Sequence, residues 1–159
     1  MNVLRAAAAT MILGFVVAPN ISAQVRVTVP AKSFSVDEKI TAKVQNDGDQ
    51  PVTICVESGQ ISKSGPTAVS TPVPFTIEGR VLGKWKALMV SPEGAAEGSV
   101  VVLESKKSLD FPFWPPSKGE LRLQMHYWPG AQPNIDCAKP PAESHNAKDT
   151  TFAVHAAPK

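Results

Sequence analysis

Ser144, His145 and Asp149 are the residues whose types could form a hydrolytic Ser–His–acid constellation. A serine becomes a nucleophile when a histidine takes its proton and an acid orients that histidine. All three lie in one polar stretch, and the sequence holds no G-x-S-x-G turn that would present a serine on a sharp elbow. Such residues occur in polar stretches by chance. We therefore expect no catalytic residue and no enzymatic activity.

Met125, His126, His145 and His155 are potential ligands for copper or zinc. Met125 and His126 are neighbours in a segment that alternates like a β-strand, so their side chains point to opposite faces. This spacing favours a core position for Met125 and a solvated position for His126. We expect no metal site and no cofactor, and metal binding stays an alternative.

Two tryptophans stand next to rigid proline turns, in Trp114-Pro115-Pro116 and Trp128-Pro129-Gly130. Exposed aromatic rings desolvate well and often contact protein or glycan partners. We interpret Trp114, Trp128 and His126 as a candidate partner surface. The alternative is that each tryptophan caps the open end of a core.

Residues 1–23 have the three parts of a cleavable secretory signal peptide. Arg5 supplies a positive start, and residues 6–17 form an uncharged apolar run too short to span a membrane. Pro19 and Asn20 break a helix, and Ala23 follows small residues at a cleavage position. We expect cleavage after Ala23, a mature domain of residues 24–159, no membrane span after cleavage, and a periplasmic or secreted location.

Export makes a disulfide between Cys55 and Cys137 the simplest fate of the two cysteines, because exported compartments are oxidising. Closing a loop of this length stabilises a fold by about 4 kcal/mol on the chain-entropy model. No C-x-x-C spacing supports a reactive or metal-binding pair.

Composition excludes one class of partner and limits the architecture. Arg5 is the only charged residue of the signal segment, so the remaining chain has 15 basic and 14 acidic residues. A nearly neutral chain lacks the clustered positive charge that nucleic-acid binding requires. The 15 prolines and 10 glycines indicate many turns and few long helices.

Period-two alternation dominates the rest of the chain, and no segment has a helical period. Residues 40–45 and 52–57 flank a turn cluster at 46–51 and are expected to pair as a hairpin. We expect Trp85 to anchor the core, and Pro112 to place its strand at a sheet edge. Polar loops are expected at residues 58–74, 91–98 and 129–149. The other expected strands are residues 24–29, 75–77, 83–89, 100–103, 109–113, 121–128 and 151–155.

Seven or eight short strands in one domain describe an all-β antiparallel sandwich. The segment SFSVDEKITAKVQNDGDQPVTICVE resembles the opening strands of immunoglobulin-like domains of secreted bacterial proteins. VVVLESKKSLDFPF and GELRLQMHYWPG resemble their later turn and penultimate strand. Ser105-Lys106-Lys107 departs from the usual Pro-Gly turn, and Leu121 stands where a tyrosine is common. The hairpin, the tryptophan and the late strand pair are also similar to proteinase inhibitors of the BsuPI type, a family described as intracellular.

The resemblance implies an immunoglobulin-like β-sandwich without catalytic function. We expect an exported binding or accessory module of the cell envelope with a protein or glycan partner. A secreted proteinase inhibitor presenting residues 58–74 and a periplasmic metal-binding protein are the alternatives. Fold alone does not decide among them.

Overall fold

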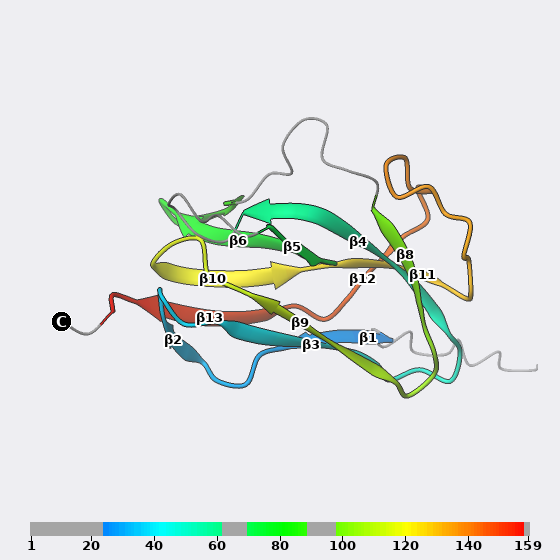
Figure 1. The fold of residues 1–159 in the computed structure, drawn as a ribbon, viewed down its shortest axis with the longest axis horizontal. Helices are drawn as coiled ribbons and strands as arrows, with labels where there is room; N and C mark the ends of the chain where they lie inside the picture. Colours follow the sequence, from blue (N-terminus) through cyan, green and yellow to red (C-terminus); the bar gives the residue numbers. More distant parts are fainter. Residues whose placement is uncertain (1–23, 62–69, 89–97, 158–159) are drawn as a thin grey trace, which may run out of the picture.

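The computed structural model describes residues 24–61, 70–88 and 98–157. These residues contain thirteen β-strands and no helix (Figure 1). No described segment is therefore a helix that could cross a bilayer. The expected signal peptide lies outside the described residues.

The strands are short and separated by turns, as the proline and glycine content predicts. Their bounds are β1 Val25–Thr28, β2 Ser33–Ser35, β3 Ile40–Asn46, β4 Val52–Ile61, β5 Ser70–Val73, β6 Thr76–Val81, β7 Lys84–Ala87, β8 Ser99–Leu103, β9 Ser108–Phe113, β10 Gly119–Gln124, β11 His126–Pro129, β12 His145–Asn146 and β13 Thr150–His155.

The strands form three sheets around one core (Figure 1). One sheet has the order β1-β3-β9, a second has β2-β13-β10-β6-β7, and a third has β12-β11-β4-β5 with β8 also paired to β4. All pairs are antiparallel except β2 with β13. Phe113 of the first sheet contacts Phe152 of the second edge to face, with ring centroids 6.2 Å apart. The expected all-β architecture of packed, mainly antiparallel sheets is confirmed.

Alternation of apolar and polar residues correctly predicts which side chains are buried. Val25 and Val27 on β1, and Phe152 and Val154 on β13, face the core. Leu121 and Leu123 of β10, Tyr127 of β11 and Met125 between the two strands are likewise buried. The proline-containing β9 is an edge strand of its sheet, as Pro112 predicts.

The expected hairpin between residues 40–45 and 52–57 is wrong. β3 pairs with β1 and β9, whereas β4 pairs with β5, β8 and β11, so residues 47–51 carry the chain from one sheet to another. β8 and β9 are joined by a second crossing of the same kind. Such crossings are the connections of an immunoglobulin-like sandwich. The prediction failed because apolar and polar residues alternate in the same way in two strands that pair as a hairpin and in two strands that enter different sheets.

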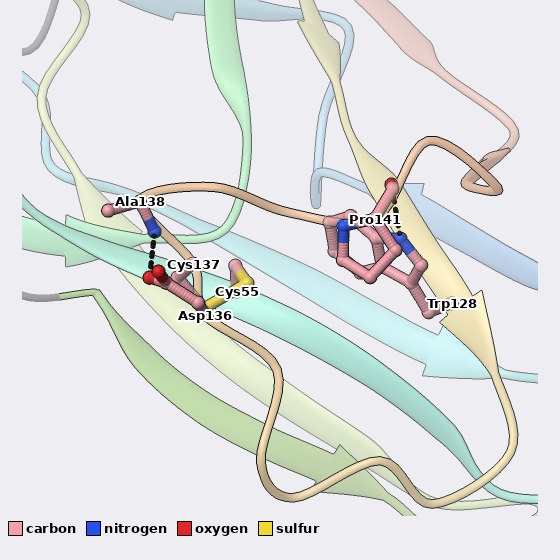
Figure 2. The surroundings of a disulfide bond; sticks show 6 residues. All are labelled: Cys55, Trp128, Asp136, Cys137, Ala138 and Pro141. Atoms are coloured by element: carbon pink, nitrogen blue, oxygen red, sulfur yellow. Dashed lines mark hydrogen bonds between the residues drawn. A yellow bond between two sulfur atoms is a disulfide. The ribbon is translucent and has the colours of Figure 1, made fainter.

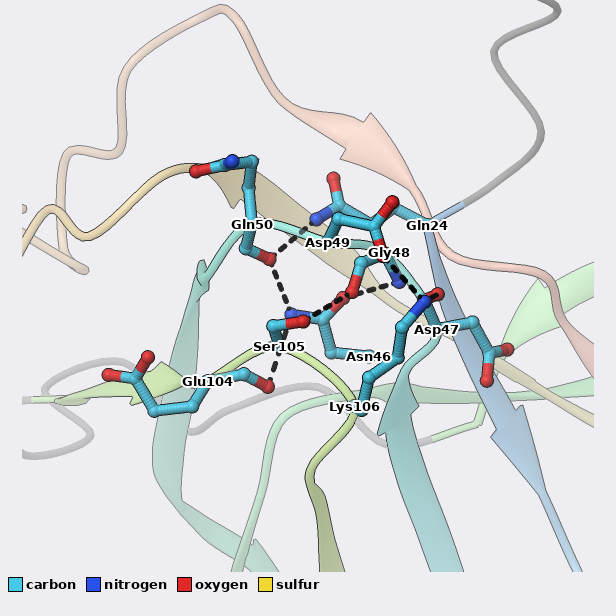
Figure 3. A network of polar contacts seen from close by, with 9 residues as sticks. All are labelled: Gln24, Asn46, Asp47, Gly48, Asp49, Gln50, Glu104, Ser105 and Lys106. Atoms are coloured by element: carbon cyan, nitrogen blue, oxygen red, sulfur yellow. Dashed lines mark hydrogen bonds and ion pairs between the residues drawn. The ribbon is translucent and has the colours of Figure 1, made fainter.

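A buried asparagine joins the two crossings (Figure 3). Asn46 is fully buried, and its Nδ2 donates to the carbonyl oxygens of Gln50 at 2.8 Å and Leu103 at 3.1 Å. Its Oδ1 accepts from the Gly48 N–H at 3.0 Å, and Ser105 Oγ donates to the Gly48 carbonyl at 2.8 Å. One side chain therefore ties the β3–β4 connection to the β8–β9 connection.

Charged residues strengthen the same junction from outside. Lys106 donates to the Asp47 carbonyl at 2.6 Å and pairs with Asp49 at 2.8 Å (Figure 3). The hydrogen bond and the charge of Lys106 hold the pKa of the exposed Asp49 carboxyl below its usual value. Arg26 pairs with Asp47 at 3.1 Å and so attaches β1 to the junction.

Other sequence expectations need correction. Trp85 does not anchor the core: it is half-buried, and the Arg122 guanidinium lies 4.7 Å from its ring centre. Its strand β7 is the edge strand beyond β6. Arg122 lies between the buried Leu121 and Leu123 and therefore projects outward, so its contact with Trp85 places the ring on the outer face of the sheet. The loop expected at residues 58–74 is in part the paired end of β4 and β5, with residues 62–69 outside the description. Nearly all of the loop expected at 91–98 also lies outside it. The strand number exceeds the expected seven or eight because several elements have only two to four residues.

Candidate functional site

The segment between β11 and β12 folds over the outer face of β4 and β11. Trp128 pairs with Thr53 across these strands, so their side chains share a face, and Cys55 lies two residues further along the same face. The intervening Ile54 points the other way, into the core. We call residues 130–144 the covering loop.

Three attachments hold the covering loop in place. Thr53 Oγ donates to the Gly130 carbonyl and accepts from the Gln132 N–H, each at 2.8 Å. Cys55 and Cys137 form the expected disulfide, with Cα atoms 5.6 Å apart (Figure 2). Trp128 Nε1 donates to the Pro141 carbonyl at 3.1 Å (Figure 2).

These attachments explain why Trp128 is buried although it follows the inward-facing Tyr127. Only 5% of its surface is exposed, because the covering loop lies over it. The indole N–H keeps a hydrogen-bond partner in this position, which burial of a tryptophan requires. The disulfide also depends on a close approach of the residue that precedes β8: a Cβ on Gly98 would lie 2.8 Å from the Cβ of Cys137.

A cavity of about 380 Å³ opens between the covering loop, the start of β6 and the outer face of β11. The disulfide and the Trp128 ring form part of its wall, with Phe75 and the Pro140-Pro141 pair. Its polar lining comes from Thr76, Gln124, His126 and Ser144, and no Asp, Glu, Lys or Arg is among the described residues that line it. A mostly apolar cavity of this size with a few polar groups is typical of small-ligand sites.

Two of the three residues of the candidate partner surface meet at this cavity. His126 and Trp128 lie two apart on β11 and both line it. Trp114 does not line it; this half-buried ring follows Phe113, and Lys39 Nζ lies 5.1 Å from its centre. Whether these tryptophans contact a partner stays a prediction.

The histidines do not converge. His145 lies opposite Tyr127, with ring centroids 5.6 Å apart, whereas His126 projects from the other face of β11. His155 pairs with Ser35 at a different sheet edge. Within the described ranges, no three His, Cys, Asp or Glu side chains form a metal-binding group.

The Ser–His–acid residues are also not arranged as a triad. Asp149 Oδ2 lies 3.7 Å from Arg122 Nη1, so its charge faces the outer surface of β10. Ser144 lines the cavity. The loop that a proteinase inhibitor would present, residues 58–74, lies partly in paired strands and partly outside the described residues.

Sequence reasoning missed the cavity walls supplied by Phe75, Pro140 and Pro141. One signal could have found the two prolines. They follow Cys137 closely, and a disulfide from Cys137 to Cys55 brings them over the strand that pairs with Trp128. Phe75 gives no such signal, because its position depends on how β6 packs.

Comparison with known proteins gives a likeness to solved structures but none at the level of sequence. No protein-family model matches the sequence, and no curated protein matches it significantly. Among solved structures, the ASH / PapD-like domain of human CEP192 (PapD-like domain 7) is similar at 12% sequence identity and a TM-score of 0.36. The match covers 94% of this chain and 100% of that chain. A likeness of this size says nothing of function, which must be argued from the chain's own residues.

Proposed function

We propose that this protein is an exported, non-catalytic binding module of the cell envelope that holds an uncharged, apolar group of its partner in the cavity beside the Cys55–Cys137 disulfide. The observation behind this proposal is the cavity lining, which combines the disulfide, Trp128 and a proline pair and, among the described side chains, includes no Asp, Glu, Lys or Arg. A charged ligand would lose its hydration there without gaining an opposite charge, which is costly.

The polar residues at the cavity give a ligand its orientation. Gln124 and Ser144 can each donate and accept hydrogen bonds, and the exposed His126 adds an imidazole. Trp128 supplies its ring face, since its N–H is already used by Pro141. An aromatic or proline-containing group with one or two hydrogen-bonding atoms fits this chemistry.

The binding site can be tested with a neutral fluorescent probe, N-phenyl-1-naphthylamine, and its charged relative anilinonaphthalene sulfonate. We expect the neutral probe to bind with enhanced fluorescence and the sulfonate to bind at least tenfold more weakly, a difference of about 1.4 kcal/mol. Absence of neutral-probe binding, or equal binding of both probes, would contradict the proposal.

A matched pair of substitutions in the covering loop locates the probe. Ala142 is exposed and lines the cavity, so Ala142→Phe should fill its mouth and weaken probe binding. Ala138 is exposed in the same loop but does not line the cavity, so Ala138→Phe should leave binding unchanged. Equal effects of both substitutions would place the probe elsewhere.

Export is tested separately by sequencing the N-terminus of the protein recovered from the periplasm or medium of expressing bacteria. We expect it to begin at Gln24, as cleavage after Ala23 requires. Retention in the cytoplasm with Met1 or Asn2 at the N-terminus would remove the envelope from the proposal and leave the cavity to be judged by probe binding.

A further inference from the structure

The β6–β7 hairpin ends in a turn that projects a large apolar side chain into solvent. Leu82 and Gly83 have φ values of 50° and 79°, so both central residues of the turn are left-handed. Turns of this kind prefer asparagine or aspartate before glycine, and a leucine there is strained. The Leu82 side chain is 96% exposed and makes no contribution to the core. Neither the turn nor the core accounts for leucine at this position.

Three lysines without an ion-pair partner among the described residues surround the same tip. Val81, 39% exposed, extends the apolar tip, and its register partner is the exposed Lys84. Lys86 follows on the same face of β7. Lys118 directly precedes β10, whose start lies beside the end of β6. In the part of the chain that the structure describes, none of these three lysines has an ion-pair partner.

The other cations of the hairpin region are neutralised. Arg80 pairs with Glu120 at 3.0 Å, and Arg122 pairs with Glu78. Trp85, on the opposite face of β7 from the lysines, is half-buried beneath the Arg122 guanidinium. The tip thus offers two apolar residues with three lysines that pair with no described acidic residue, next to an aromatic residue of the type enriched at membrane–water interfaces.

We propose that the β6–β7 tip docks the protein on an anionic phospholipid bilayer. Val81 and Leu82 enter the headgroup region while Lys84, Lys86 and Lys118 meet lipid phosphates. A specific protein interface buries roughly 1,000 Å² or more around an apolar centre, which two residues on a convex turn do not provide. A bilayer surface requires no matching shape and attracts both an isolated apolar side chain and unpaired lysines.

The proposal also orients the molecule and is independent of the cavity proposal. Thr76, the first residue of β6, lines the cavity, and Val81, the last, belongs to the tip. Five residue steps along a strand separate them by about 16 Å. A protein held by the tip therefore keeps its cavity away from the lipid surface.

The test is co-sedimentation of the exported protein with phosphatidylcholine vesicles that contain or lack phosphatidylglycerol. We expect binding only to the anionic vesicles, and weaker binding as salt is raised. Leu82→Asn should weaken it by about tenfold through loss of apolar burial. Because asparagine suits the turn, this variant should be at least as stable as the wild type, so lost binding will not reflect unfolding.

Charge is tested by the double variant Lys84→Gln, Lys86→Gln, which should weaken binding by roughly 25-fold. The control Lys107→Gln, Lys148→Gln removes two exposed lysines elsewhere and should have little effect. Leu109→Thr, which removes a 37%-exposed leucine from β9, is the matched apolar control.

The proposal is overturned if the wild type does not bind anionic vesicles, or if the tip variants bind as the controls do. A crosslinked protein complex that needs Leu82, in the absence of vesicle binding, would instead assign the tip to a protein partner. Loss of probe binding at the cavity does not affect this test.

Discussion

Replacing Asn46 by alanine should destabilise the fold by about 3 kcal/mol, because two backbone groups lose their partner inside the protein. The Leu103 carbonyl loses a hydrogen bond in a buried position, and the Gly48 N–H loses one in a partly buried position. A buried polar group left unpaired costs about 1–3 kcal/mol. The Gln50 and Glu104 carbonyls belong to exposed residues, and water can replace Asn46 there.

Chemical denaturation of the oxidised protein measures this loss. Asn134→Ala is a matched control, because this asparagine is exposed in the covering loop and its replacement should change the free energy of unfolding by less than about 0.5 kcal/mol. A loss below about 1 kcal/mol for Asn46→Ala would show that the asparagine does not join the two crossings energetically.

Asn46→Asp separates the donor from the acceptor role. The new carboxylate can accept from the Gly48 N–H, but its charge would face carbonyl oxygens that now lie 2.8 to 3.1 Å from Nδ2. Burial against these oxygens raises the pKa of the introduced carboxyl in the folded state. The variant should therefore be less stable than Asn46→Ala at neutral pH and should recover stability as the pH falls. No recovery on acidification would refute this reasoning.

Three further predictions concern the charged junction and the disulfide. Lys106→Gln should raise the pKa of Asp49 toward its usual value, as NMR titration of that carboxyl would show. Because the pKa of Asp49 is lowered in the folded state, its pairing with Lys106 stabilises the fold at pH values above the pKa of the unfolded state. This stabilisation is lost as the pH falls through the pKa of the folded state. Gly98→Ala should cost about 1–3 kcal/mol in chemical denaturation, because the new methyl would lie 2.8 Å from the Cys137 Cβ. Replacing both Cys55 and Cys137 by serine should lower the free energy of unfolding by about 4 kcal/mol, and unchanged denaturation would contradict this.

Alternation predicted the inward and outward faces of the strands well, because burial of one face imposes it locally. It could not predict partners. Residues 40–45 and 52–57 look like a hairpin, yet they enter different sheets. The one local sign of the crossing is Asn46, a polar residue at an inward position that ends β3. In a solvent-exposed hairpin, water would pair with the backbone groups of the turn, and a buried side-chain amide such as that of Asn46 would not be required.

The candidate site was only partly predictable for a similar reason. The Cys55–Cys137 bond follows from having two cysteines in a chain that is expected to be exported, and His126 with Trp128 follows from their strand. The cavity, however, is formed by a loop that folds back over the outer face of a sheet. The alternation of apolar and polar residues predicts that side chains on this face are exposed to solvent. Trp85 illustrates the opposite error, in which a side chain at the surface is predicted to be in the core. Its ring stacks on the Arg122 guanidinium on the outer face of the sheet.

The Cys55–Cys137 bond also determines how the protein responds to a pulling force. The two cysteines are separated by 82 positions in the sequence, so the chain between them cannot be drawn out while the bond is intact. At about 3.6 Å per extended residue, roughly 290 Å of contour length is withheld from stretching. Only the segments before Cys55 and after Cys137 can lengthen, and β4 and the covering loop remain joined even after the strands separate. An oxidised molecule pulled by its ends therefore stays short and keeps Cys55 beside Cys137, from where it can refold.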